Sequence, residues 1–235
     1  MKDLFVDMFG KPFGIVLFQL IDATQYTIYL ALIAFLGGGL VALVVTMLRV
    51  SPSKHARRAG AAYTWTFQSV PLLMLLFLLG LGAPRLTGMD VNPWVAASCA
   101  LTLYTSAYLA DVWRGAIESI PRGQWEGAAA LGLRFVPVLR LVIVPQAVRF
   151  ALAPTVGFMV QIIKGTSLAY IIGFHDLMTI GKRWANAPVH GTEPFVIFPL
   201  MALIYFALCY PLSLYARHLE RNLAATRGKA TARTA

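Results

Sequence analysis

A small group of polar side chains interrupts one of the apolar stretches of this sequence. Its members are Gln161, Lys164, Thr166 and Ser167. On a helix, Gln161 and Lys164 share one face because they are three residues apart. Two interpretations stay open: the lysine reaches a lipid headgroup or a structural partner, or the group lines a water-filled cavity and attracts a carboxylate. Gln68 is a further candidate for such a path.

A second set of ionisable side chains has the types that bind metal ions. It consists of His175, Asp176, His190 and Glu193. Its spacing does not resemble His-Glu-x2-His or another compact ligand set, so a membrane-embedded metal enzyme is a minor alternative. Two cysteines, Cys99 and Cys209, stand alone in apolar stretches and indicate neither a metal site nor a disulfide framework. We therefore assign no catalytic residue and no metal ligand.

The elements that carry these residues are predicted to be membrane helices. Of 235 residues, 58% are hydrophobic and only 13% are charged, which excludes a soluble globule of this size. No Asp, Glu, Lys or Arg occurs within 23–48, 59–84, 91–110 or 194–216, and 150–174 carries Lys164 alone. Each stretch reaches the roughly 20 residues that span a bilayer. The sequence predicts an all-α bundle of about five transmembrane helices.

Basic residues give this bundle an orientation. Lys and Arg gather in residues 49–58, 111–149 and 217–233, which fall on one side of the membrane if five helices alternate. Because positive connections stay in the cytoplasm, the N-terminus is predicted outside and the C-terminus inside. Residues 1–22 would then form a periplasmic or interfacial segment, and 219–235 a basic cytoplasmic tail. This sidedness also explains the net charge of +10 without a nucleic-acid partner.

The connection over residues 113–145 is too long and too apolar to be a plain loop. Pro121 can begin a helix and Gly132 can end it, which predicts a short helix between them. The apolar side chains of that helix are Trp125, Ala128, Ala129 and Leu131. Two interpretations are open from composition alone. The helix packs on its own bundle, or it projects from the cytoplasmic face and fits a socket on another subunit.

Three elements of this connection carry a family resemblance. The similarity is to the EAA signature of bacterial ATP-binding cassette import permeases, and it is carried by Glu126-Gly127-Ala128, then Gly132 after three intervening residues, then Val142-Ile143-Val144-Pro145 after nine more. Gly127, Val142 and Val144 are conservative departures from that signature. Residues 114–117, 120–126, 145–147, 166–169 and 202–206 resemble the subfamily of histidine, glutamine, glutamate, arginine and opine permeases, as do 71–73, whereas 68–70 depart from it.

This resemblance covers about residues 23–220 and implies a fold, partners and site residues. It implies a type I importer permease domain over 23–218, in the inner membrane of a bacterial cell, with a cytoplasmic coupling loop over 113–145. The residues implied for coupling to an ATPase are Trp125, Glu126, Gly127, Ala128, Gly132 and Pro145. The implied partners are two cytoplasmic ATPase subunits, a second permease chain that is identical or related, an extracytoplasmic solute-binding protein, an amino-acid substrate and membrane lipid.

The chain itself is not expected to hydrolyse ATP. It contains no Gly-x4-Gly-Lys-Ser/Thr loop, so ATP and Mg would be used by the partner ATPase and no cofactor by this chain. The sequence thus predicts the permease subunit of an ATP-driven amino-acid importer. A stand-alone secondary transporter is the main alternative, although it needs more spans and leaves the Glu126 helix unexplained. Dependence of uptake on a partner ATPase separates these functions.

Overall fold

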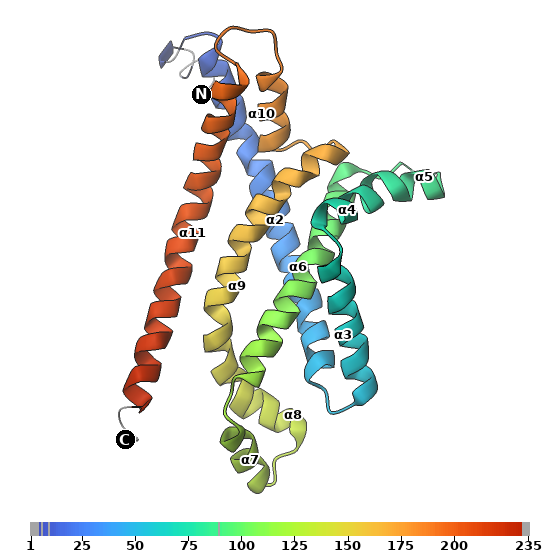
Figure 1. Ribbon diagram of the computed structural model, residues 1–235, viewed down its shortest axis with the longest axis vertical. Coiled ribbons are helices and arrows are strands. Elements are labelled where there is room, and N and C mark those ends of the chain that lie inside the picture. Colours follow the sequence, from blue (N-terminus) through green and yellow to red (C-terminus); the bar gives the residue numbers. More distant parts are fainter. Residues whose placement is uncertain (1–4, 6, 9, 89, 232–235) are drawn as a thin grey trace.

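Long helices running roughly parallel form the body of the protein (Figure 1). The computed structural model describes residues 5, 7, 8, 10–88 and 90–231, and this part of the chain contains helices and no strand. The bundle is built from α2 (Phe13–Val50), α6 (Pro93–Glu118), α9 (Val144–Thr166) and α11 (Pro194–Thr231). Four candidate membrane spans contain these helices, and a bent helix pair raises the number to five. The predicted all-α membrane bundle is confirmed.

The predicted span over residues 59–84 is not one straight helix. α3 (Lys54–Ser69) is followed by α4 (Leu72–Phe77), the π-helical η1 (Leu78–Gly82) and α5 (Ala83–Thr87), and the chain turns by 94° between α3 and α4. Pro71 explains the break, because a proline lacks a backbone N–H and disfavours helical conformation in the residue before it. Val70 is accordingly extended, with φ −96° and ψ 124°.

The span predicted over residues 150–174 begins earlier than the charge pattern indicates. A continuous helical segment joins α8 (Phe135–Pro137), the π-helical η2 (Val138–Ile143), α9 and the 3₁₀ helix η3 (Ser167–Ile172). Pro145 lies in the first turn of α9, just after η2, so its missing N–H interrupts the hydrogen bonding of this continuous helical segment at the junction. The connection between α6 and α8 is therefore shorter than 113–145, and α7 (Arg122–Ala130) occupies most of it.

Close packing of α2 against α6 holds the centre of the bundle. Small residues line this contact, among them Ala34 and Gly38 on α2 and Ala97 and Ala100 on α6. The two backbones approach so closely at Gly38 that an added Cβ would lie 2.6 Å from the Cβ of Thr105. Small side chains permit such an approach between membrane helices, where contact rather than water exclusion stabilises the pair.

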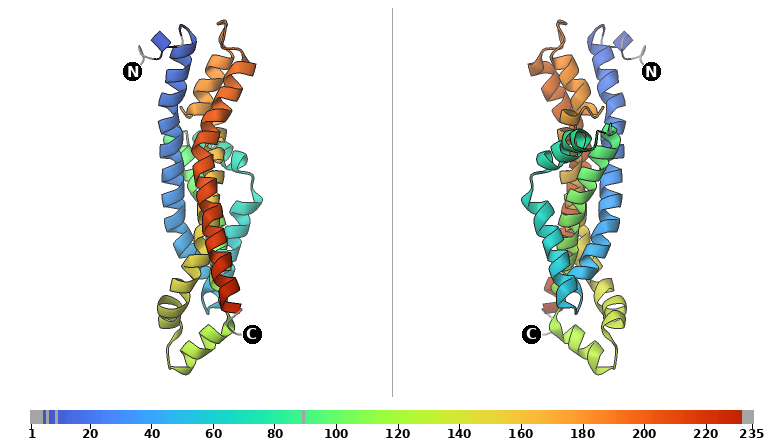
Figure 2. Two further views of the ribbon diagram at one scale, coloured as in Figure 1. Left: turned by 90° about the vertical axis from the view of Figure 1, so that its left-hand side faces the viewer. Right: turned by 90° about the vertical axis from the view of Figure 1, so that its right-hand side faces the viewer.

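The two ends of the bundle carry different elements (Figures 1 and 2). The α2–α3 connection, α7, α8 and the C-terminal end of α11 lie at one end, and the N-terminal end of α2 lies with α10 (Leu177–Ala185) at the other. The basic connections thus share one end, as the predicted orientation requires. Which end faces the cytoplasm stays a prediction.

The N-terminal turns of α2 extend the bundle at the α10 end. α2 has 38 residues, and a helix of that length measures about 57 Å, well beyond the roughly 30 Å hydrocarbon core of a bilayer. Val16 and Leu20 from these turns pack against Leu177 and Ile180 of α10 and Ile197 of α11. Residues 13–22 of the predicted interfacial segment are therefore part of the first helix, while residues 1–4, 6 and 9 lie outside the described part.

Candidate functional site

α7 is the short helix that the sequence predicts between Pro121 and Gly132. Pro121 occupies its N-cap position, and Gly132 follows its C-terminus with φ +76°. The N–H of Gly132 donates to Ala129 O at 2.9 Å and the N–H of Leu133 donates to Ala128 O at 3.3 Å. This is the Schellman pattern, in which a glycine with positive φ ends the helix.

One side of α7 packs on its own chain. Ala128 is 6% exposed and lies in a core with residues from α6, η2 and α9, which are Ala116, Ile117, Ile120, Val138, Leu139, Ile143 and Ala147. The Trp125 ring stacks near Phe135, with 6.4 Å between the ring centroids. Of the two interpretations of this helix, packing on the bundle is therefore correct for Trp125 and Ala128.

The other side of α7 is open. Glu126, Gly127, Ala129 and Ala130 are exposed, and Leu131 is 81% exposed. No atom lies within 4 Å of a Cβ built on Gly127 or Gly132. The apolar side expected from the sequence is thus divided, because Ala129 and Leu131 do not share the buried face of Trp125 and Ala128. A shallow surface of small side chains remains, with one carboxylate and one leucine.

A hydrogen bond of Gln146 links α7 to α9. Its Nε2 donates to Gln124 Oε1 on α7 at 3.2 Å and to Val142 O at 2.7 Å. Pro145 lies beside it and is exposed. The predicted coupling residues are therefore gathered at one end of the bundle, although they play different parts: Trp125 and Ala128 anchor α7, Glu126 and Gly127 are presented, and Gly132 shapes the exit.

A polar network near the same end was not predicted. Arg49 at the end of α2 forms an ion pair with Asp111 on α6 at 3.2 Å and a hydrogen bond to Thr64 on α3. Arg114 also pairs with Asp111, at 3.1 Å. Gln68 Nε2 donates to Ala107 O at 3.1 Å and to Asp111 Oδ2 at 3.4 Å. Gln68 therefore cross-links α3 to α6 and does not line the groove that contains Lys164.

Two of the four polar residues around position 164 line a common groove. It has a volume of about 530 Å³ and lies between the end of α9 with η3 and the middle of α11. Its lining residues are Lys164, Ser167, Ala202, Tyr205, Phe206, Cys209, Tyr210, Ser213 and Arg217. Gln161 is exposed and does not line it, and the buried Thr166 donates to Ile163 O at 2.7 Å. The sequence missed the α11 side because no local pattern connects the two helices.

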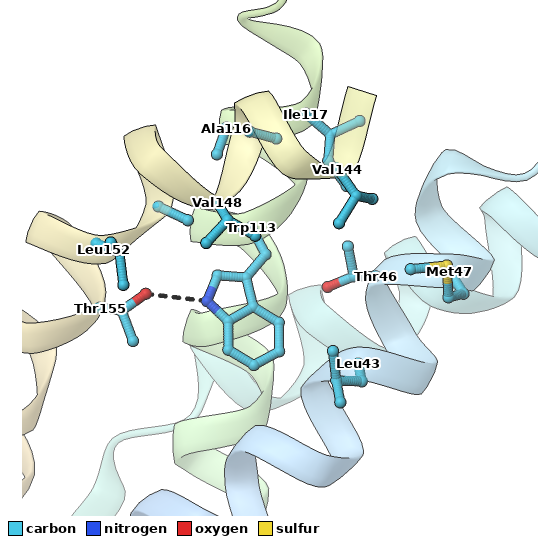
Figure 3. Close-up of a pocket in the computed structure, with 12 residues that line it drawn as sticks. Leu43, Thr46, Met47, Trp113, Ala116, Ile117, Val144, Val148, Leu152 and Thr155 are labelled. Atoms are coloured by element: carbon cyan, nitrogen blue, oxygen red, sulfur yellow. Dashed lines mark hydrogen bonds between the residues drawn. The ribbon is translucent and has the colours of Figure 1, made fainter. Parts of the chain in front are cut away.

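A second cavity lies between α2, α6 and α9 and is almost wholly apolar (Figure 3). Its volume is about 250 Å³. Trp113 points into it and donates from Nε1 to Thr155 Oγ1 at 2.9 Å, while Leu43, Met47 and Val148 line its walls. The described residues that line it include no charged side chain, so the cavity offers nothing to hold an ionised solute.

The histidines and carboxylates near the α10 end do not gather into one cluster. In the described part of the chain, no group of three His, Cys, Asp or Glu side chains is placed to hold a metal ion. Asp176 is buried and caps α10, accepting from Thr179 N at 2.9 Å, and burial raises the pKa of its carboxyl to about 6. Glu193 lies 3.5 Å from exposed His190, and backbone hydrogen bonds lower its pKa.

Comparison with known proteins agrees with this architecture. Residues 36–225 match the family described as binding-protein-dependent transport system inner membrane component. The chain is 31% identical over 207 residues to the probable amino-acid ABC transporter permease protein YckA of Bacillus subtilis, covering 87% of this chain and 88% of that protein. It is 33% identical over 199 residues to the probable glutamine ABC transporter permease protein GlnP of the same organism, covering 85% and 91%.

Solved structures show the same fold. A crystal structure of an amino acid ABC transporter with histidines superposes with a TM-score of 0.79 at 26% identity, covering 87% of this chain and 94% of that one. An inward-facing MetNI methionine ABC transporter gives a TM-score of 0.69 at 18% identity, covering 86% and 96%. The chain belongs to the family of inner membrane components of binding-protein-dependent transport systems.

Proposed function

We propose that this chain is the permease subunit of an ATP-driven amino-acid importer and that α7 is the helix through which a cytoplasmic ATPase moves it. The observation that carries this proposal is the division of α7 into two sides. Ala128 is buried in the chain's own core, whereas Glu126 and Gly127 face outward with space around them. A helix that is fixed on one side and open on the other can transmit the movement of a partner to the bundle.

The anchoring of α7 supports this transmission. Its core contains residues of α6, η2 and α9, so a displacement of α7 acts on two membrane helices at once. Close-packed interiors transmit such displacements because they have few voids to absorb them. The Gln124–Gln146 hydrogen bond adds a polar link to the same end of α9.

The exposed side of α7, hereafter the presented surface, can fit into a socket on a protein partner; it consists of Glu126, Gly127, Ala129, Ala130 and Leu131. A glycine and two alanines allow a partner backbone to approach closely, the exposed Leu131 can enter an apolar pocket, and the Glu126 carboxylate can accept hydrogen bonds or pair with a basic group.

In this proposal the partner ATPase uses ATP and Mg. A second permease chain completes the path, because the four or five spans of one chain are too few to enclose it and seal it alternately, and a solute-binding protein delivers the amino acid.

The test is ATP-dependent uptake that depends on the α7 surface. The chain is purified in mild detergent with the ATPase that accompanies it, reconstituted in liposomes with its binding protein, and assayed for uptake of labelled amino acids with and without ATP. Gly127→Arg places a large cation on the presented surface without an intramolecular clash, since the position is open. We expect it to release the ATPase and abolish uptake while the bundle stays folded.

A matched control adds the same side chain elsewhere at the same end of the bundle. Ser53 lies in the α2–α3 connection, is exposed, and makes no capping hydrogen bond through its side chain. Ser53→Arg is expected to keep both the ATPase and uptake. Uptake by the parent that runs on an ion gradient without ATP would instead establish a secondary transporter, and equal loss in both variants would remove α7 from the mechanism.

A further inference from the structure

The groove between α9 and α11 contains a lysine side chain that has no ion-pair partner in the described part of the chain. This side chain is that of Lys164. Arg217, further along α11, adds a second positive charge and is hydrogen-bonded to Ser213 O at 3.4 Å. The described lining of the groove includes no Asp or Glu. The described residues that line the groove therefore carry two positive charges and no negative one.

The depth of Lys164 argues against a headgroup as its partner. The residues of α11 that face it across the groove include Cys209, close to the midpoint of the span Pro194–Leu223. A position near mid-span is about 15 Å from either edge of a hydrocarbon core roughly 30 Å thick, which is beyond the reach of one lysine side chain. A cation held there without a pair is costly unless the groove contains water or an anionic group.

The walls of the groove can accommodate the rest of an amino acid. Ser167 contributes a hydroxyl beside Lys164, and its own O–H donates to Lys164 O at 2.6 Å. Across from it, the rings of Phe206 and Tyr210 are stacked with 4.9 Å between centroids. An aromatic face attracts an ammonium group, and the hydroxyls can bond to polar side chains. The volume of about 530 Å³ falls in the range of small-molecule sites.

The carboxylate of Asp176 lies near the groove without lining it. Asp176 acts electrostatically on Tyr205, which lines the groove, but its side chain is wholly buried and is not among the lining residues. Its Oδ1 accepts from Thr179 N at the start of α10. Asp176 therefore offers no surface to a cationic side chain in the groove.

Resting on the function proposed above, we propose that the groove between α9 and α11 receives the carboxylate of the transported amino acid on Lys164, and that its uncompensated positive charge selects acidic and neutral amino acids over cationic ones. The α-carboxylate, which all amino acids share, pairs with the lysine. A side-chain carboxylate gains from the same field, and a guanidinium or second ammonium is repelled by it. Lys164 is thus a specificity-determining residue of the permease.

The test measures binding to the permease complex without the binding protein, because a binding protein imposes its own selection. The permease and ATPase are placed in nanodiscs of zwitterionic lipid, and labelled L-glutamate, L-glutamine and L-arginine are added. The parent is expected to bind glutamate and glutamine more tightly than arginine. Lys164→Met should weaken glutamate binding by about 10-fold to 100-fold, which is the loss for one charge-assisted hydrogen bond. It should also reduce the ratio of the affinity for glutamate to the affinity for arginine.

Two further variants separate charge from folding. Lys164→Arg keeps the cation and is expected to keep the order of the three ligands. Lys54→Met removes the same charge from an exposed position at the start of α3, outside the groove, and should leave all three affinities at the parental value. If Lys164→Met does not assemble, Lys164→Gln replaces it with a neutral polar side chain of similar length.

Different results would overturn the role of Lys164 and the proposed function. Unchanged glutamate binding in the neutral variant, Lys164→Met or its replacement Lys164→Gln, overturns the inference even if ATP-dependent uptake is intact. Arginine bound as tightly as glutamate by the parent also overturns it. Repeating the measurement with phosphatidylglycerol in the nanodiscs identifies a lipid site: a retained anionic lipid that disappears in Lys164→Met, with amino-acid binding unaffected, also overturns it. A complex that shows no ATP-dependent uptake of any amino acid would refute the proposed function instead, since the binding measurement does not require turnover.

Discussion

Replacing Asp176 by asparagine should stabilise this protein at neutral pH, although it removes a charge at a helix N-terminus. Asp176 is wholly buried at the start of α10, and its Oδ2 has no hydrogen-bond partner among the described residues. Asparagine is an equally good N-cap, so the bond from Thr179 N to the side-chain oxygen at 2.9 Å can be kept. What the substitution removes is the cost of holding a carboxylate away from water.

The pKa of Asp176 gives the magnitude and the sign. Burial, opposed by the hydrogen bonds from Thr179, raises the pKa from 3.8 to about 6, which corresponds to about 3 kcal/mol. Below pH 3.8 the carboxyl is neutral in both the folded and the unfolded chain, and no stability is lost. Between pH 3.8 and 6 the unfolded chain releases this proton and the folded chain keeps it, so the free energy of unfolding falls. Above pH 6 the loss is complete.

The assay compares parent and Asp176→Asn at matched pH from 4 to 8 in one detergent. Thermal unfolding reports global stability, and hydrogen exchange of residues 177–185 reports the docking of α10. The variant should match the parent near pH 4 and become progressively more stable until about pH 6.5, by up to about 3 kcal/mol. Asp22→Asn, at an exposed position on α2, should show no such divergence.

Two results would refute this reasoning. A variant that is less stable than the parent at pH 7.5 would mean that the carboxylate has a compensating partner in the assembled protein. A difference in stability between parent and variant that stays constant with pH would mean that asparagine alters packing rather than charge.

Two glycines give further predictions, each with a control on the same helix. In thermal unfolding, Gly38→Ala should destabilise the bundle by about 1–3 kcal/mol, because the added Cβ would lie 2.6 Å from Thr105 and overpacking has that cost. Its control is Gly39→Ala, whose added Cβ makes only an ordinary contact at 3.8 Å. The control should leave the stability unchanged or raise it. Gly132→Ala places a Cβ at φ +76° and should cost about 1–2 kcal/mol, seen as faster hydrogen exchange in α7, whereas Gly127→Ala inside the helix should slow that exchange.

The sequence predicts those features whose causes are local. The helix between Pro121 and Gly132 follows from two residues with fixed conformational preferences, and the structure places both at the expected positions. The membrane helices follow from long stretches without charge. The break at Pro71 is also local in origin, but it is hidden from a charge count because the apolar stretch continues through it.

Features that depend on contacts between distant residues could not be predicted in this way. Arg49 and Asp111 are 62 residues apart in sequence, and Gln68 joins them only because α3 packs beside α6. The division of α7 is a similar case. Ala128 and Ala129 are identical in type, so composition does not reveal that only Ala128 packs against η2. The α11 side of the groove depends on the angle between two helices.

The arrangement of α9 connects the two proposed sites. Its first turn packs in the core that anchors α7, and its last turn carries Lys164 into the groove. The 21 residues from Val144 to Lys164 amount to about 30 Å of helix. Pro154 interrupts the hydrogen bonding of this helix midway, and the π-helical η2 precedes it, so bending is easiest at these two places. Under the proposed function, a displacement of α7 therefore reaches the groove along α9 without requiring α2 and α6 to separate.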